Sequence, residues 1–169
     1  PLGIEIGAHI ANIGAVKDTG FDPVTLDPEM FLSLKGELPF LDREKAAAAR
    51  QTAEDAAKNG DSVGGSIECA ITGLKAGLGD PFFDSAESVL SSLLFSIPAV
   101  KGVEFGAGFR MCEAYGSETN DPFVFDETGA VKTASNNNGG ILGGITNGMP
   151  LIFRTAIKPT ASIYQKQQS

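Results

Sequence analysis

The residues best suited to chemistry lie close together near the end of the chain. Lys158, Thr160 and Ser162 supply one cation and two hydroxyls, and Pro159 fixes the direction of the backbone between them. A lysine ammonium binds a phosphate as a point charge, and hydroxyls donate hydrogen bonds. Five glycines precede these residues within Gly139–Gly148, where bare backbone lets a flat or phosphorylated ligand come close. The spacing alone leaves two interpretations open, a ligand surface and structural glycine packing.

A hairpin is predicted to position these residues. Asn147-Gly148 lies between Ile141–Thr146 and Met149–Ile157, and this dipeptide between apolar runs is a strong signal for a two-residue turn. Alternation along the return strand predicts two faces. One carries Leu151, Phe153, Thr155 and Ile157, and the other carries Ile152, Arg154, Ala156 and Lys158. Because the chain carries a formal charge of −8, a phosphate site would need a local cationic cluster such as Lys158 with Arg154.

The glycines do not fit the known phosphate loops. A dinucleotide fingerprint needs G-x-G-x-x-G at the start of a helix, but Gly140, Gly143 and Gly144 have other spacings and strand signals follow them. A P-loop needs lysine and then serine or threonine after its last glycine, whereas Met149-Pro150 follows here. Both nucleotide-binding interpretations fail.

The rest of the chain predicts an α/β domain with mixed or antiparallel pairing. Strands are expected at Leu2–Val16, Val63–Leu74 and Val100–Phe105, a short helix at Glu29–Lys35, and a helix or turn at Ala107–Ala114. A helix at Arg43–Lys58 begins at the cap Asp42, ends at Asn59-Gly60, and buries a stripe of Ala46, Ala49, Ala53 and Ala56. A second helix, Phe82–Ile97, is expected to begin at the cap Asp80 with Pro81 first, and its apolar stripe, which includes Phe83, Leu93 and Ile97, is interpreted as core. Gly116–Ala134 is polar and is expected to be a long mobile loop.

Two single residues invite functional interpretations that the sequence does not favour. His9 is the only histidine, so no histidine pair can bind a metal, and a partly exposed strand position is expected for it. Glu68 lies in the strand Val63–Leu74, on the face opposite Gly65, Ile67, Cys69 and Ile71, which are expected to point inward. A carboxylate in such a strand is more often exposed or paired than catalytic.

Composition narrows the class of protein. The length of 169 residues and the apolar content of 42% predict one domain, 1–169, with a substantial core. The charge argues against nucleic acid as a partner, and no apolar run reaches the roughly 18 residues of a membrane helix. The two cysteines have no disulfide or zinc spacing, which favours the reducing cytoplasm. Pro1 at the start suggests a piece cut from a longer chain.

Several blocks of this sequence resemble chorismate synthases. They are N-N-N-G-G-I-L-G-G-I-T-N-G-M-P and K-P-T-A-S-I around the hairpin, G-D-S-V-G-G-S-I-E-C-A-I-T-G-L-K-A-G-L-G-D-P at Gly60–Pro81, S-I-P-A-V-K-G-V-E-F-G-A-G-F at Ser96–Phe109, and G-S-E-T-N-D at Gly116–Asp121. Long ungapped blocks in the same order make the resemblance specific between Gly60 and Ile163. Before Gly60 it is weaker.

The resemblance implies a fold, a reaction and a site. The fold would be a β-α-β sandwich, α/β or α+β, with long helices between mostly antiparallel sheets and a homotetramer as the assembly. The reaction would be that of a carbon–oxygen lyase acting on phosphates: an anti 1,4-elimination of phosphate from 5-enolpyruvylshikimate 3-phosphate to give chorismate, with reduced FMN as cofactor. Carried over by position, the flavin contacts would be Pro98, Ala99, Gly143, Lys158, Pro159, Thr160, Ala161 and Ser162. Together they are expected to form one wall of a flavin pocket.

Other blocks of the family do not occur in these residues. The G-x-S-H-G block, a second histidine segment, an R-S-S flavin motif and R-H-D-P-C are missing, and with them the histidine general acids. No catalytic residue is therefore assigned, and the 169 residues alone are expected to be inactive. A non-catalytic module that keeps the fold, associates or binds flavin weakly remains an alternative, as does an unrelated α/β small-molecule sensor. Use of NADP to reduce the flavin also stays open.

Overall fold

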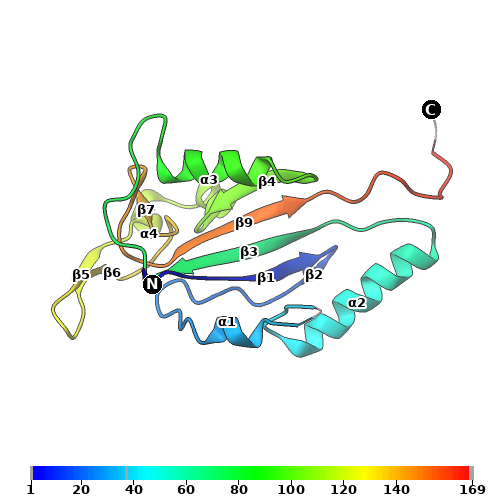
Figure 1. Cartoon of the computed structure of the whole chain (residues 1–169), viewed down its shortest axis with the longest axis horizontal. Helices are drawn as coiled ribbons and strands as arrows, with labels where there is room; N and C mark the ends of the chain where they lie inside the picture. Colours follow the sequence, from blue (N-terminus) through cyan, green and yellow to red (C-terminus); the bar gives the residue numbers. More distant parts are fainter. Residues whose placement is uncertain (1, 37, 168–169) are drawn as a thin grey trace.

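The computed structural model describes residues 2–36 and 38–167, so Pro1, on which the expectation of a cut chain rests, lies outside the described residues. Its largest element is a five-stranded antiparallel sheet with the order β2-β1-β3-β9-β4 (Figure 1). The strands are β2 (Val16–Lys17), β1 (Glu5–Ile13), β3 (Gly65–Thr72), β9 (Leu151–Ile157) and β4 (Val100–Phe105). Strands from the beginning, middle and end of the sequence therefore share one sheet.

Helices cover both faces of this sheet. The helices α1 (Met30–Ser33) and α2 (Arg43–Lys58) lie below it in Figure 1, and α3 (Ala86–Phe95) lies above it. The smaller elements are η1 (Gly108–Glu113), α4 (Gly116–Thr119), the hairpin β5 (Phe123–Phe125) with β6 (Val131–Thr133), and the hairpin β7 (Ile141–Leu142) with β8 (Ile145–Thr146). Antiparallel sheets with packed helices confirm the predicted α+β class.

The face of the sheet beneath α1 and α2 is closed. Phe21, Leu26, Phe31, Leu34, Ala70 and Ile152 form its apolar cluster. The helix α2 forms as predicted, since the Asp42 side chain accepts hydrogen bonds from the Glu44 and Lys45 amides at its first turn. Of the predicted alanine stripe, Ala49 is completely buried, whereas Ala46, Ala53 and Ala56 are half-buried, and the helix contacts β1 and β2. We call this side the closed face.

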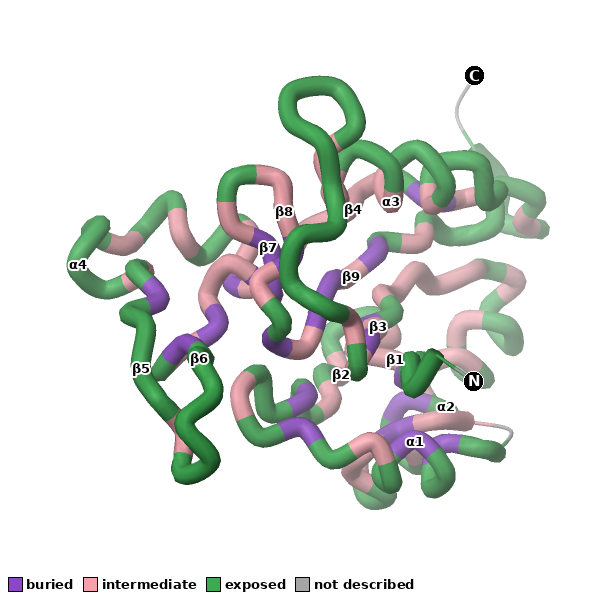
Figure 2. The backbone as a smooth tube through the Cα atoms, turned by 60° about the vertical axis from the view of Figure 1, so that its left-hand side comes forward, coloured by how far each residue is buried: buried purple, intermediate pink, exposed green. Residues whose placement is uncertain are grey.

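The opposite face, beneath α3, is covered only in part. Ile71, Ile141, Leu151 and Phe153 form its buried cluster, and Ala86, Leu90 and Leu94 of α3 pack against them. No residue of α3 is buried, however, and Leu93 is 62% exposed. Figure 2 shows the same contrast, with buried segments beside α1 and largely exposed backbone along α3. We call this side the open face.

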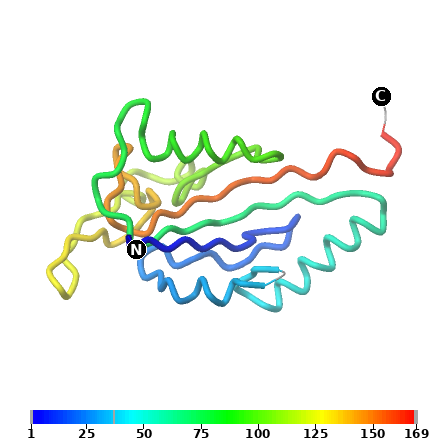
Figure 3. Tube along the Cα trace, viewed as in Figure 1, coloured from blue at the N-terminus to red at the C-terminus, as the bar shows by residue number. Residues whose placement is uncertain are grey.

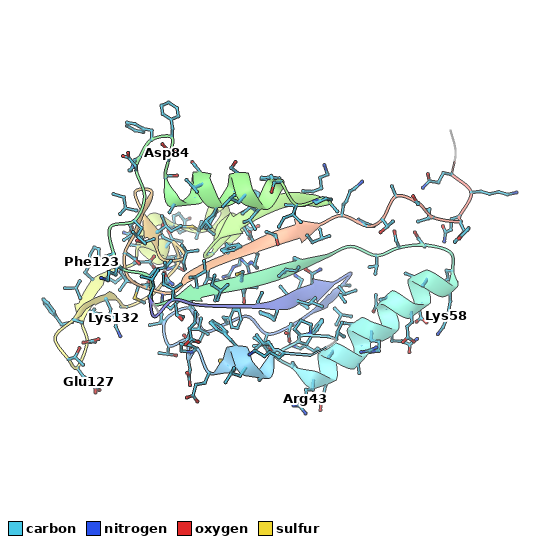
Figure 4. The ribbon with its side chains drawn as sticks, viewed as in Figure 1. Arg43, Lys58, Asp84, Phe123, Glu127 and Lys132 are labelled. Atoms are coloured by element: carbon cyan, nitrogen blue, oxygen red, sulfur yellow. The ribbon has the colours of Figure 1, made fainter. Side chains whose placement is uncertain are left out.

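The start of α3 differs from the prediction. The helix begins at Ala86, and its cap is Ser85, whose hydroxyl accepts a hydrogen bond from the Ser88 amide. Asp80 does not cap it, because Asp80 and Asp84 pair with each other across a narrow loop. Phe82 and Phe83 stand at 90% and 89% exposure on this loop, so Phe83 is not core. Figure 4 labels Asp84 where the loop projects from the body.

Two other expectations change. The segment predicted as a long mobile loop contains α4 and the β5–β6 hairpin, which projects from the body at the residues labelled Phe123, Glu127 and Lys132 in Figure 4. The predicted turn at Asn147-Gly148 is instead a connection between β8 and β9. The turn of the glycine hairpin lies earlier in the chain, at Gly143-Gly144 between β7 and β8, where both φ angles are positive at +60° and +84°. Two positive φ angles are what a type I′ hairpin turn requires.

Candidate functional site

The predicted cationic segment begins where β9 leaves the sheet. The Lys158 amide donates a hydrogen bond of 3.0 Å to the Ala99 carbonyl, which extends the pairing of β9 with β4 by one step. Ala99 has a φ of +73°, an unusual value for a residue with a Cβ, and such backbone strain is often found at ligand sites. The structure therefore brings the Pro98-Ala99 segment beside Lys158, although the two lie far apart in the sequence.

The residues that follow Lys158 are all accessible. Lys158, Pro159, Thr160, Ala161 and Ser162 are exposed, and so is Pro98. The Ser62 hydroxyl donates a hydrogen bond of 2.6 Å to the Thr160 carbonyl, which holds this strand extension against the segment before β3. Its side chains can thus meet a ligand while its backbone is fixed. Figure 3 shows this segment leaving the sheet at the end opposite the N-terminus.

Arg154 does not join Lys158 in a cationic cluster. Its Nε lies 2.7 Å from Glu104 Oε1, and its Nη2 donates to the Gly106 carbonyl at 3.2 Å. Its Nη1 also lies 3.9 Å from Glu68 Oε1. Because the guanidinium is already surrounded by carboxylates, the expected pairing of Lys158 with Arg154 for a phosphate is wrong.

Gly143 lies at the other end of α3. Nothing comes within 4 Å of the position that a Cβ on Gly143 would take, so its backbone is open on that side. The carbonyl of the next residue, Gly144, accepts a hydrogen bond of 2.9 Å from the amide of Ala86, the first residue of α3. Since Ala99 follows the last turn of the same helix, the ten residues of α3 separate the two parts by about 15 Å. Within one chain, the structure does not bring Gly143 beside Lys158–Ser162.

A hub of asparagines supports the glycine segment. Asp121 accepts hydrogen bonds from the Ser135 hydroxyl and from the amides of Asn137 and Asn138. Asn136 is 3% exposed, and its side chain joins Gly140 to Pro150. The sequence showed these residues only as part of a family block, with no role for any of them.

The closed face contains a buried ionic network that the sequence did not predict. His9 is 1% exposed, rather than partly exposed as expected. Its Nδ1 lies 3.0 Å from Asp18 Oδ2, and its Nε2 lies 3.0 Å from Glu68 Oε2. Each ring nitrogen thus lies within hydrogen-bond distance of a carboxylate oxygen, one from Asp18 and one from Glu68. Glu68 is paired, which is one of the two alternatives that the sequence favoured.

The network closes with backbone donors. Asp18 accepts from the amides of Leu41 and Asp42, and Glu68 accepts from the amide of Phe21. The ring edge of His9 meets Phe21 at a centroid distance of 4.7 Å. With every polar atom of the histidine engaged, the network fastens the closed face, and its histidine has no free nitrogen for proton transfer.

Two cavities adjoin this network. One, of about 470 Å³, is lined by Glu68, Arg110, Asn136, Asn137, Ile152 and Arg154 among others, and its neighbour, of about 240 Å³, shares Glu68 and Arg154 with it.

On the other face, burial and then the charge of Glu68 raise the pKa of the Cys69 thiol to about 11. Cys69 is therefore a neutral thiol at pH 7 and a poor nucleophile.

Comparison with known proteins identifies the family. The model of the family described as chorismate synthase matches residues 1–169. The chain belongs to the chorismate synthase family. The chorismate synthase of Thermococcus gammatolerans is 48% identical over 168 residues, which are 99% of this chain and 45% of that protein. The chorismate synthase of Methanosarcina barkeri is 44% identical over 172 residues, again 99% of this chain and 45% of the relative.

A solved structure agrees with these relatives. A structure titled "Crystal Structure of Chorismate Synthase" superimposes with a TM-score of 0.82 at 32% identity, covering 94% of this chain and 50% of the other. The chain thus spans about half the length of the chorismate synthases that it matches. The family and its fold are established for these residues, and in the described part no helix is long and apolar enough to cross a membrane.

Proposed function

We propose that this chain belongs to an enzyme that eliminates phosphate from 5-enolpyruvylshikimate 3-phosphate to give chorismate, a carbon–oxygen lyase that needs reduced FMN. Membership of the chorismate synthase family supports the reaction. The observation that carries the site is the hydrogen bond between the Lys158 amide and the Ala99 carbonyl, because it joins the two family blocks expected to contact the flavin. The proposed enzyme is cytoplasmic, consistent with two free cysteines.

The exposed residues at this junction fit an anionic, partly flat ligand. The ammonium of Lys158 would bind the phosphate of the nucleotide, and the hydroxyls of Thr160 and Ser162 would donate hydrogen bonds to it. Pro159 and the strained turn at Ala99 hold the two backbones in fixed directions. When bound, reduced FMN would lend electron density transiently to the C–O bond that breaks. The chain's own contribution is to hold and orient it.

Gly143 would present bare backbone to the same ligand, since nothing comes within 4 Å of the position that its Cβ would take. Within one chain, the turn at Gly143-Gly144 and Lys158 are separated by the length of α3. A ligand can contact both only if it lies along the helix, or if a second copy of the chain brings its own turn close. We propose that the chain associates with itself, with a homotetramer as the assembly of the whole enzyme. The open face, which keeps apolar side chains such as Leu93 in solvent, supports association.

A flavin titration tests the proposed site. Addition of the 169-residue chain should quench the fluorescence of FMN. Under anaerobic conditions, the absorbance change of reduced FMN should saturate as the protein concentration rises. Lys158→Ala should weaken binding about tenfold, which is the order of effect when one charged hydrogen bond to a phosphate is lost. Lys35→Ala is the matched control, since it removes an exposed lysine beside α1. Equal affinity of the wild type and Lys158→Ala would refute the role of Lys158.

Activity is a separate measurement. We propose that the 169 residues alone form no chorismate, since the histidine blocks of the family do not occur in them. Incubation with 5-enolpyruvylshikimate 3-phosphate and reduced FMN should leave the substrate unchanged by chromatography. Chorismate production would contradict this part of the proposal while supporting the reaction itself. A chain that binds flavin without turnover would behave as the non-catalytic module.

A further inference from the structure

Asp121 is an almost buried carboxylate at the base of the β5–β6 hairpin. It is 8% exposed, and it directly precedes Pro122, whose carbonyl accepts a hydrogen bond from the Ala134 amide at 2.9 Å. The hairpin thus leaves the body beside this carboxylate and returns to it. None of the ion pairs found in the described residues includes Asp121, so uncharged donors stabilise its charge.

Five donors converge on the two oxygens of Asp121. Oδ1 accepts from the Ser135 hydroxyl at 2.7 Å, from the Asn137 amide at 2.7 Å and from Asn137 Nδ2 at 3.1 Å. Oδ2 accepts from the Asn138 amide at 2.8 Å and from Asn138 Nδ2 at 2.7 Å. A carboxylate is the one side chain that can accept at all these positions, because an amide would turn a donor toward one of these groups.

The protonation state agrees with this geometry. Burial raises the pKa of Asp121, but the hydrogen bonds from Asn138, Ser135 and Asn137 outweigh burial and lower the pKa below its ordinary value. Asp121 is therefore ionised at neutral pH. The charge-assisted hydrogen bonds that result are about twice as strong as bonds between neutral groups.

The asparagines pass this restraint to the glycine segment. The Asn137 carbonyl accepts from the Ala107 amide at 2.7 Å, and the Asn138 carbonyl accepts from the Ile141 amide at 3.4 Å at the start of β7. Asn136 Oδ1 accepts from the Gly140 amide at 2.6 Å. The turn at Gly143-Gly144 follows directly, so its position is determined from the side of Asp121 as well as from α3.

We infer that Asp121 is a positioning residue that orders the segment Asn136–Gly144 and so places the open backbone of Gly143. Its relevance to flavin rests on the proposed function, in which Gly143 contacts the cofactor. The ordering itself does not depend on flavin. Asp121 touches no reacting atom and acts through Asn137 and Asn138.

The test compares Asp121→Asn with Asp126→Asn in the 169-residue chain. Asp126 is a fitting control, because it also accepts backbone and hydroxyl hydrogen bonds in the β5–β6 hairpin, from Thr128 and Ala130, without touching the asparagines. Amide hydrogen exchange should become at least tenfold faster at Asn138 and Gly140 in Asp121→Asn and stay unchanged in α2. The control should leave both regions unchanged. Unchanged exchange at Asn138 and Gly140 in Asp121→Asn would overturn the inference.

Flavin affinity separates positioning from a purely structural role. If the wild type binds FMN, Asp121→Asn should bind it about tenfold more weakly, whereas Asp126→Asn should bind as the wild type does. Faster exchange with unchanged affinity would overturn the positioning role. If the wild type binds no FMN, the proposed flavin wall fails, and exchange still decides whether Asp121 orders the segment. If Asp121→Asn does not fold, Asn138→Ala removes one side-chain donor and should give the same exchange pattern at smaller amplitude.

Discussion

The closed and open faces of the sheet are built from the same strands but are finished differently. On the closed face, His9, Glu68 and Ala70 lie under 10% exposure beneath the segment that contains α1 and α2. On the open face of the same strands, Ile6 is 65% exposed and Ile67 is 40% exposed. The register pairs His9 with Glu68 and Ile10 with Ile67, so each face continues across both strands. A charged network is thus sealed on one side while isoleucines meet water on the other.

The contrast between the closed and open faces shows which surface of the sheet this chain covers with its own residues. Burying ions is costly unless each is paired, and the closed face pairs them fully. Isoleucines left in water forfeit the free energy of burying their apolar surface. A larger exposed apolar patch marks a surface that another polypeptide covers. We therefore expect mutations on the closed face to change the stability of this chain and mutations on the open face to change its association.

His9→Ala should have the largest effect. It removes the imidazole between Asp18 and Glu68 and leaves two buried carboxylates without their histidine partner. Breaking a buried ion pair in this way costs about 3–5 kcal/mol in the free energy of unfolding. Urea denaturation at pH 7, followed by circular dichroism, measures it. Leu93→Ala on the open face is the matched control, and equal losses in the two variants would remove the distinction between the faces.

Ala49→Leu should have an intermediate effect. Ala49 is completely buried between α2 and the sheet, so three additional carbon atoms must displace the helix or its neighbours. Overpacking of this kind costs about 1–3 kcal/mol. Ala57→Leu places the same side chain on the exposed side of the same helix and controls for helix propensity. Thermal unfolding should show a lower Tm for Ala49→Leu alone, and a stability equal to the wild type would show that the closed face is loosely packed.

Leu93→Ser should have the smallest effect on stability and a clear effect on association. Its side chain is 62% exposed, so the free energy of unfolding should change by about 0.5 kcal/mol or less. Light scattering over a concentration series should show association of the wild type and less association of the variant. Phe125→Ser, on the exposed β5–β6 hairpin, is the control for a general loss of apolar surface. A wild type that stays monomeric throughout the series would count against the open face as an interface.

Elements governed by nearby residues were predicted well from the sequence. The helix Arg43–Lys58 and the strand Val100–Phe105 have the predicted bounds, because caps, glycines and periodicity act within each segment. The start of α3 was misplaced because Asp80-Pro81 has the pattern of a helix start. In the structure, Asp80 instead pairs with Asp84, and the Ala86 amide meets the Gly144 carbonyl from a distant segment. No local pattern reports such a contact.

The strand faces and the site show the same limit. Alternation correctly indicated a strand around His9, but it could not show which side α1 and α2 would cover. For the site, the junction of Ala99 with Lys158 required the register of β4 with β9. The distance of Gly143 from that junction depends on where α3 lies. Asp121 could have been noticed only as an acid at the end of a family block, since its five donors come from residues 14 to 17 positions later.

The contacts at the two ends of α3 mean that this helix also spaces the two parts of the proposed site. Its first amide is tied to the Gly144 carbonyl, and the residues after its last turn lead directly to the Ala99–Lys158 junction. The number of turns in α3 therefore sets the distance between the turn at Gly143-Gly144 and Lys158. One added turn would lengthen that gap by about 5.4 Å while leaving both ends chemically intact. In the proposed site, a ligand that reaches both ends would therefore need a span set by the length of α3, even without touching the helix.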